Sequence, residues 1–185
     1  MRHVLFSILL ATACATTPAL AADRVITSTS TSTSTSTSTS TSNNKKHARE
    51  ADVAAISAVV EQFKAAVIAR DGKAIGSLFL QEHGSWLSVP DAPTWIAVKA
   101  RNPAATKVVV SSWRKFADFV QNSPKPVEER FYNVRIDTNG TIGSVYFDFD
   151  FLVDGKVTNR GSESWQLLRA DDGWKISAML YSMGD

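Results

Sequence analysis

Cysteine is nearly absent from this sequence of 185 residues, which contains only Cys14. A single cysteine excludes an intramolecular disulfide and a thiolate zinc cluster. Histidine is also scarce, with three in the chain, so the sequence indicates neither a metal site nor a cofactor. The 20 basic and 18 acidic side chains leave a formal net charge of +2. That balance does not favour binding to nucleic acid or to an anionic membrane.

No apolar run is long enough to span a membrane. The short run near the N-terminus fits a different kind of segment. Arg2 precedes a short apolar stretch over residues 4–11, and a small-residue stretch follows it. This pattern is typical of a secretory signal peptide, residues 1–21, with cleavage after Ala21 and export to the periplasm or the medium. A lipid anchor through Cys14 is the less favoured alternative, because the signal before it would be very short.

An apolar face is missing from the next segment, where Thr and Ser alternate from Thr27 to Ser42. Such a chain cannot repay the entropy of folding, so residues 22–49 are predicted to form a disordered leader. The leader could be a spacer, a glycosylated tract or a repeat expansion without function. The folded domain is expected over residues 50–185, long enough for one hydrophobic core.

Three helices are predicted in the first half of this domain. Apolar residues recur at steps of three and four after Asp52, which can cap a helix, and Asp71-Gly72 would end it. A short second helix follows directly, and a third begins at Ser111 or Ser112. The Pro- and Trp-containing segment before the third helix is predicted to be irregular, with short strands at its two ends.

Four strands are predicted in the second half, because three turn signals separate them. The turns are Asn139-Gly140, Asp154-Gly155 and Asp172-Gly173, and the strands cover about 129–137, 142–153, 159–169 and 174–182. Consecutive hairpins make an antiparallel meander. The predicted fold class is therefore α+β, with three N-terminal helices packed on the concave face of a curved antiparallel sheet.

The order of these elements, together with four short motifs, resembles the nuclear transport factor 2-like superfamily, which includes ketosteroid isomerase and the SnoaL-like cyclases. The motifs are ARDG at 69–72, IGSLF at 75–79, GSESWQLL at 161–168 and DGWKI at 172–176. The resemblance covers nearly all of residues 50–185. It implies a cone-shaped fold with a pocket between helices and sheet, and a homodimer. It does not decide function, because the fold hosts enzymes and non-enzymes alike.

Ketosteroid isomerases use a helix tyrosine, an aspartate base and a protonated aspartate, and this sequence can be compared at each place. The matching positions are Phe63, then Leu87 or Ser88, then Ser164. All three roles lack their residue type, so this mechanism is not expected. The resemblance places Phe63, Phe149, Ser164 and Tyr181 in the pocket.

Other aromatic and titratable residues leave alternatives open. Trp86 and Trp95 suit the pocket mouth or the core equally. His83 is a weak candidate for a catalytic base, because no orienting carboxylate is in view, and an exposed histidine is the commoner case. Asp148 and Asp150 alternate with three Phe residues, which favours an outward, solvated position over a pocket acid pair.

The alternation of side chains between the two faces of the strand around Ser164 leads to a further prediction. If Ser164 faces the pocket, Glu163 and Trp165 face outward together with the Asp148–Asp150 pair. An outer face bearing Trp165 and Leu167 calls for a cover, and a homodimer would supply one. Arg130 and Arg169 are then the expected partners of the two Asp residues.

Three functions remain from the sequence. The favoured one is an exported, non-catalytic module that binds a small apolar or aromatic ligand without a cofactor. The alternative is a cofactor-free SnoaL-like acid–base enzyme of isomerase, cyclase or hydrolase type. The second alternative is a tethered protein-interaction domain. Two titratable groups converging in a closed pocket would favour the enzyme.

Overall fold

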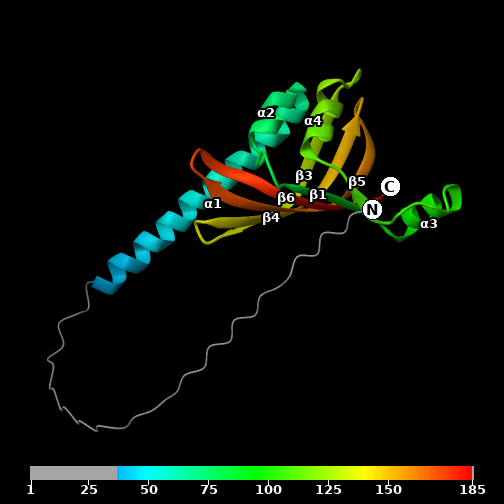
Figure 1. Cartoon of the computed structure of the whole chain (residues 1–185). Helices are drawn as coiled ribbons and strands as arrows, with labels where there is room; N and C mark the ends of the chain where they lie inside the picture. Colours follow the sequence, from blue (N-terminus) through cyan, green and yellow to red (C-terminus); the bar gives the residue numbers. More distant parts are fainter. Residues whose placement is uncertain (1–36, 185) are drawn as a thin grey trace, which may run out of the picture. The chain divides into compact units, whose positions relative to one another are not determined.

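The computed structural model describes residues 37–184, which Figure 1 draws in colour. The predicted signal peptide and residues 22–36 of the predicted leader lie outside the described residues. The elements are α1 Thr37–Ala69, α2 Gly72–Ser77, β1 Ser85–Pro90, α3 Ala92–Arg101, β2 Val109–Val110, α4 Trp113–Gln121, β3 Val127–Thr138, β4 Ile142–Val153, β5 Lys156–Ala170 and β6 Gly173–Met183. Within this part of the chain, no helix is both long and apolar enough to cross a membrane.

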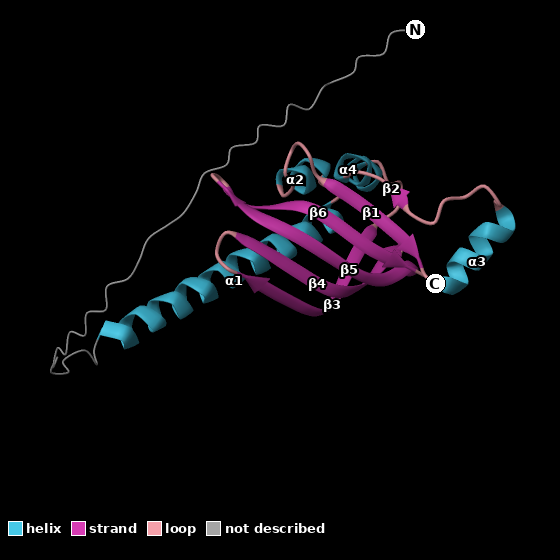
Figure 2. Cartoon of the chain, turned by 60° about the horizontal axis from the view of Figure 1, so that its bottom comes forward, coloured by secondary structure: helices cyan, strands magenta, loops and turns pink. Residues whose placement is uncertain are grey.

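The six strands form one sheet in the order β2-β1-β6-β5-β4-β3, which Figure 2 shows in magenta. The predicted α+β class is confirmed, and the predicted meander runs from β3 to β6. The sheet is mixed rather than wholly antiparallel, because β1 pairs with β6 in parallel. A parallel pair needs a long connection, and the chain between β1 and β6 provides one.

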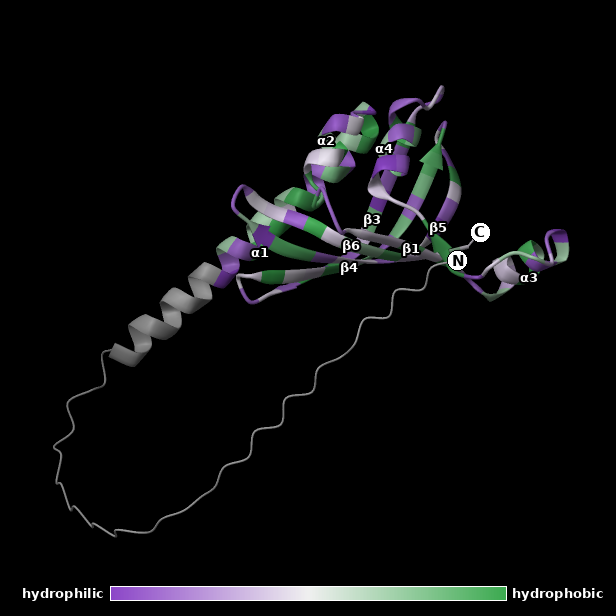
Figure 3. Cartoon of the chain, in the orientation of Figure 1, coloured by the Kyte–Doolittle hydropathy of each residue, from purple (hydrophilic) through white to green (hydrophobic). Residues whose placement is uncertain are grey.

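Helices α1, α2 and α4 lie on one face of the sheet (Figure 1). Helix α1 contacts β3 and β6, and α2 contacts both α1 and α4. In Figure 3 the part of α1 beside the sheet carries the green, apolar segments. The buried core lies between these layers, with Phe63 of α1, Phe147 of β4 and Trp165 of β5 among its largest side chains. Burial of this apolar surface is the main force that holds helices and sheet together.

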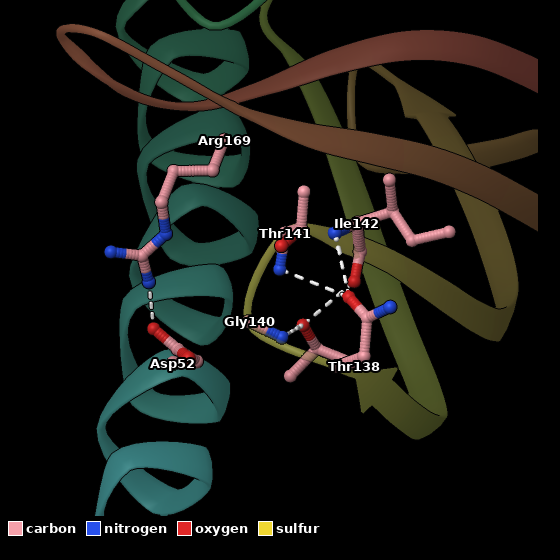
Figure 4. Close-up of polar contacts among 7 residues, drawn as sticks. Asp52, Thr138, Gly140, Thr141, Ile142 and Arg169 are labelled. Atoms are coloured by element: carbon pink, nitrogen blue, oxygen red, sulfur yellow. Dashed lines mark hydrogen bonds and ion pairs between the residues drawn. The ribbon is translucent and has the colours of Figure 1, made fainter.

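All three predicted hairpins form, but the last turn consists of Asp171 and Asp172, because Gly173 already begins β6 opposite Ala170. Side chains stabilise the first turn. Asn139 Oδ1 accepts hydrogen bonds from the backbone N–H groups of Thr141 and Ile142, both at 3.0 Å. Thr138 Oγ1 accepts one from the N–H of Gly140, also at 3.0 Å (Figure 4). At the next turn, Asp154 and Gly155 both have positive φ, as a two-residue turn between twisted strands requires.

Helix α1 begins at Thr37 rather than at Asp52. Residues 37–49, predicted as part of a disordered leader, therefore belong to the helix. Once a helix is nucleated on the packed residues of its C-terminal half, each further residue adds one backbone hydrogen bond. Asp52 is consequently not a cap; its carboxylate pairs with Arg169 and ties α1 to β5 (Figure 4).

Helix α3 lies in the segment predicted to be irregular. Asp91 caps it by accepting a hydrogen bond from the Thr94 N–H at 2.9 Å, and Pro93 is tolerated because it falls in the first turn. No residue of α3 is buried, so no apolar periodicity marks it in the sequence. Figures 1 and 2 both draw it away from α1, α2 and α4.

Candidate functional site

A cavity of about 310 Å³ lies on the helix-covered face of the sheet. Its lining comes from α1, α4 and five strands: Phe63, Trp86, Phe116, Phe119, Glu129, Phe149, Phe151, Val153, Thr158, Asn159, Glu163, Met179 and Tyr181. The walls are mainly aromatic, and two carboxylic acids interrupt them. We call this space the aromatic cavity.

Strand pairing explains how the two acids come to share one cavity. Glu129 of β3 pairs with Phe151 of β4, and Glu163 of β5 pairs with Phe147 of β4 and Tyr181 of β6. Side chains alternate between the faces of a strand, so each acid points to the same face as its partners. The two carboxyls therefore flank β4 from both sides, on the side of the helices.

Both acids are nearly closed off from solvent, with Glu129 6% and Glu163 4% exposed. Burial raises the pKa of Glu129 to about 8. Burial first, and then the charge of Glu129, raise the pKa of Glu163 well above its usual range. Both carboxyls therefore keep their protons at neutral pH, and the ionisation of one would further oppose that of the other, because it would place like charges together.

Neither carboxyl has a cationic partner among the side chains that the structure describes, those of residues 49–184. No salt bridge between these side chains involves Glu129 or Glu163. The nearby indole N–H of Trp165 lowers the pKa of Glu163, against the two larger effects. That N–H nevertheless makes no hydrogen bond of ordinary geometry, so it offsets burial only weakly. The pair is held neutral by protonation rather than by a counter-ion.

The aromatic walls form a connected set of rings. The Phe63 and Phe116 rings stack with centroids 5.7 Å apart, and Trp86 lies 5.2 Å from Phe116. Tyr181 meets Phe149 edge-on at 6.1 Å. Such contacts fix the ring orientations and leave a rigid, apolar surface that suits a flat ligand.

Of the six residues that the sequence assigns to the pocket, the structure brings four together. Phe63, Trp86, Phe149 and Tyr181 line the aromatic cavity. Trp95 does not, because it lies on α3, where the ammonium group of Lys99 stands 5.3 Å from its ring centroid.

Ser164 is the second correction. It follows Glu163 directly, so it points to the opposite face of β5, where it lines a shallow hollow with Tyr146 and Leu180. The predicted outward position of Glu163 and Trp165 is wrong: Trp165 is 0% exposed, within the core. Leu167 is buried there as well.

His83 lies on an exposed turn after α2 with a positive φ of 62°. It is not part of the cavity lining. Its position gives no support to the prediction of His83 as a catalytic base.

Asp148 and Asp150 lie on the outer face of β4, as the alternation with Phe predicts. Asp148 accepts hydrogen bonds from Asn133 Nδ2 at 2.8 Å and from Ser162 Oγ at 2.7 Å. These bonds hold the pKa of Asp148 below its usual range. Asp150 accepts a hydrogen bond from the Tyr132 hydroxyl at 3.3 Å.

Among the described side chains, neither predicted cationic partner forms an ion pair with these Asp residues, although Arg130 lies directly opposite Asp150 in the β3–β4 register. Asp150 lies 3.6 Å from Nε of Arg160. Arg130 instead binds Glu128 in its own strand, and Arg169 binds Asp52.

A larger and more open hollow of about 620 Å³ lies beside the β3–β4 turn. Its acids are already paired, Asp137 with Arg49 and Asp52 with Arg169. Paired surface charges leave little for a ligand to satisfy, so the aromatic cavity is the better candidate site. Among the described side chains, no group of three or more His, Cys, Asp or Glu residues could hold a metal ion.

No protein-family model and no curated protein matches this sequence, but solved structures do. An NTF2-like protein with a cystatin-like fold from Novosphingobium aromaticivorans is 9% identical, with 83% of this chain and 93% of that chain covered and a TM-score of 0.55. A proposed scytalone dehydratase from the same species is 11% identical, with coverages of 76% and 89% and a TM-score of 0.57. A proposed dehydratase of the NTF2-like family from Streptomyces avermitilis is 17% identical, with coverages of 74% and 98% and a TM-score of 0.54. The chain therefore has the nuclear transport factor 2-like fold, as its motifs imply.

The position of the two acids in the cavity was not predicted from the sequence, although the sequence contains a signal for each. Glu129 stands between Val127 and Phe131 at steps of two, the pattern of a strand face turned to the core. Glu163 stands two residues before Trp165, the largest apolar side chain of β5. Phasing β5 on Trp165 rather than on Ser164 would have turned Glu163 inward.

Proposed function

We propose that this protein binds a small, flat and largely apolar molecule in the aromatic cavity. The observation that supports it is the pair of buried carboxyls, Glu129 and Glu163, set in an aromatic wall without a counter-ion among the described side chains. The volume of about 310 Å³ is at the lower end of the range for small-molecule sites, about 300–1,000 Å³. An open cavity fits this function better than a protein-interaction domain with a filled core.

Native mass spectrometry of the protein purified from its own host tests the proposal. A discrete added mass is expected on the wild type. The Thr158→Trp variant should lose it, because Thr158 lines the cavity and a tryptophan there would fill it. Val157→Trp is the matched control, since Val157 is exposed and outside the lining. The proposal fails if the cavity holds no molecule and aromatic fragments added at millimolar concentration leave the tryptophan fluorescence of the protein unchanged.

A second candidate function is cofactor-free acid–base catalysis, and the same carboxyl pair favours it. An acid whose pKa is raised toward neutral pH or above can donate a proton and, once ionised, accept one. The base would be a member of the pair that has lost its proton, and the aromatic wall would exclude water from the reacting group.

Ring opening of nitrobenzisoxazole provides a test of this chemistry. A carboxylate removes the ring C–H proton, the N–O bond breaks, and a coloured cyanophenolate forms. Turnover by the wild type should be lost in Glu129→Gln and Glu163→Gln, and Glu128→Gln should keep it. Equal rates in all four proteins would contradict catalysis by the carboxyl pair and leave ligand binding as the proposed function.

We further propose that the chain is exported and cleaved after Ala21, on the strength of the N-terminal pattern in residues 1–21. Mass determination of the protein recovered from the periplasm and from the medium checks both points. Full-length protein confined to the cytoplasm would contradict them.

A homodimer through the outer sheet face is also proposed. The predicted reason, exposed Trp165 and Leu167, is wrong, but other apolar side chains are exposed there, namely Tyr132, Tyr146 and Leu180. Leu180→Asp should give a monomer in analytical ultracentrifugation. Ile68→Asp, on an exposed position of α1, should leave the dimer intact.

A further inference from the structure

We propose that the molecule bound in the aromatic cavity is an organic cation: an amine or ammonium group on a flat apolar body, with its positive charge between Glu129 and Glu163. This inference rests on the proposed function of ligand binding and adds the charge of the ligand to it. Three features of the cavity support it.

The first feature is the absence of any positive side chain from the cavity lining within the described part of the chain. The lining contains two acids and no Arg, Lys or His. A carboxylate that leaves water without a cationic partner loses several kcal/mol of solvation, and a second one beside it adds repulsion. Ionisation of the pair therefore calls for a cation, and a ligand can supply it.

The second feature is the ring wall around the acids. Trp86, Phe116, Phe149 and Tyr181 all line the cavity. Aromatic ring faces carry negative potential and attract ammonium groups, most strongly where water is excluded. Carboxyls and ring faces therefore act on the same ligand charge in the same direction.

The third feature is the polar remainder of the lining, which does not suit an anion. Thr158, Asn159, Tyr181 and the indole of Trp86 supply its other polar groups, and none of them carries a positive charge near neutral pH. A ligand carboxylate or phosphate would face two acids with no basic group to bind it. Anionic ligands are thus disfavoured by the same arrangement that attracts cations.

Cation binding and proton release are linked in such a site. In the empty cavity the pair is protonated, because burial raises the pKa of Glu129 to about 8 and that of Glu163 as well. A bound cation stabilises the ionised form, so binding displaces a proton, and affinity rises with pH up to about 8. Tyr181 is the remaining titratable side chain of the lining, and α1 and α4 contribute only Phe63, Phe116 and Phe119 to it.

A neutral ligand should show the opposite dependence of affinity on pH. A ligand carbonyl or ether would accept a hydrogen bond from a protonated Glu129 or Glu163. Its affinity would fall as pH rises, because that proton is lost. The sign of the pH dependence therefore separates the two ligand classes.

Isothermal titration calorimetry of the full chain with three matched probes tests the inference. Phenethylammonium, phenylethanol and phenylacetate share a phenyl ring on a short chain and differ mainly in charge. We expect phenethylammonium to bind at least about tenfold more tightly than phenylethanol. Its affinity should be higher at about pH 8 than at mildly acid pH. The measured heat should also vary with the ionisation enthalpy of the buffer, which reports the released proton.

Variants of the pair make the test specific to the cavity. Glu129→Gln and Glu163→Gln should each remove most of the preference for the cation and flatten its pH dependence. Both are expected to fold, because a neutral glutamine replaces an acid that is already protonated. Glu128→Gln is the matched control, since Glu128 neighbours Glu129 in sequence but binds Arg130 outside the cavity.

Three outcomes would overturn the inference, and they differ in what survives. Tighter binding of phenylethanol or phenylacetate than of phenethylammonium would contradict the inference that the ligand is a cation, but it would still support the ligand-binding function. No binding by any of the three probes, with the protein folded in a thermal melt, would remove both. A cation preference unchanged in both glutamine variants would also count against it, because the charge would then be recognised elsewhere.

Discussion

Two pairs of acids lie on opposite faces of one sheet, and they differ in almost every property. Asp148 and Asp150 lie on the outer face, where neighbouring side chains donate hydrogen bonds or offer charge. Glu129 and Glu163 lie beneath the helices, buried and without a counter-ion among the described side chains. The pKa of Asp148 is lowered by its donors, whereas burial raises the pKa of both Glu residues. The face of the strand, rather than the type of residue, decides the protonation state.

The largest expected effect compares two neighbouring residues of β4. Phe149→Ala should lower the free energy of unfolding by about 3–5 kcal/mol, because it removes a buried ring from the cavity wall. Asp148→Ala, one position away on the outer face, should lower it far less. Urea denaturation of both variants measures the difference. Equal losses would mean that the two faces are packed alike.

The next effect concerns the pH dependence of stability. Folded Glu129 keeps its proton up to about pH 8, whereas the unfolded side chain releases it near pH 4.5. The folded state binds more protons between these values, so wild-type stability should fall as pH rises through that range. The Glu129→Gln/Glu163→Gln double variant should be flat there and exceed the wild type by about 2–4 kcal/mol at the alkaline end.

Urea denaturation at several pH values checks this expectation. Single variants should each recover part of the difference, since each removes one buried acid. A wild-type stability that stays constant over the range would show that the two Glu residues are solvated.

A smaller effect is expected at Gly161, which pairs with Phe149 on the inner face of the sheet. A Cβ at this position would overlap the backbone carbonyl of Ser182, so β5 and β6 would have to move apart. Gly161→Ala should cost about 1–3 kcal/mol and weaken ligand binding. Ser164→Ala, on the outer face of the same strand, should change neither quantity noticeably. Thermal melts and the calorimetric titration together measure both.

The smallest effect is expected for Asp148→Asn. The donors Asn133 and Ser162 lower the pKa of Asp148 from its usual 3.8, so its contribution is present above that pH and is lost as the pH falls through the lowered value. The variant should melt slightly earlier than the wild type at neutral pH and at the same temperature in strong acid. A difference that persists in strong acid would have another cause.

The sequence predicted the elements marked by a turn signal or by an apolar stripe, and it missed those that carry neither mark. Turns such as Asn139-Gly140 and Asp154-Gly155 define their hairpins within a few residues, so the β3–β6 meander was predictable. Helix α3 was not, because it buries nothing and so has no apolar stripe. The start of α1 was missed because helix extension follows from packing further along the chain.

The candidate site was half predictable for the same reason. The aromatic residues Phe63, Trp86, Phe149 and Tyr181 could be assigned from the resemblance and the Trp-rich segment. Glu163 was assigned to the outer face because the alternation along β5 was shifted by one residue, and such a shift moves every side chain of a strand to the other face. The local pattern could have placed Glu129 on the inner face, but its raised pKa comes from burial beneath other parts of the chain, which no local pattern encodes.

The parallel pairing of β1 with β6 has a consequence for the order in which the molecule assembles. Strand β6 is the last of the six along the chain, yet it lies between β1 and β5 in the sheet. The β3, β4 and β5 hairpins can form early from near neighbours, but β1 and β2 have no place in the sheet until β6 arrives. Met179 and Tyr181 belong to that same strand. The aromatic cavity is therefore closed by the final stretch of the fold, and the binding site comes into being only when the whole sheet does.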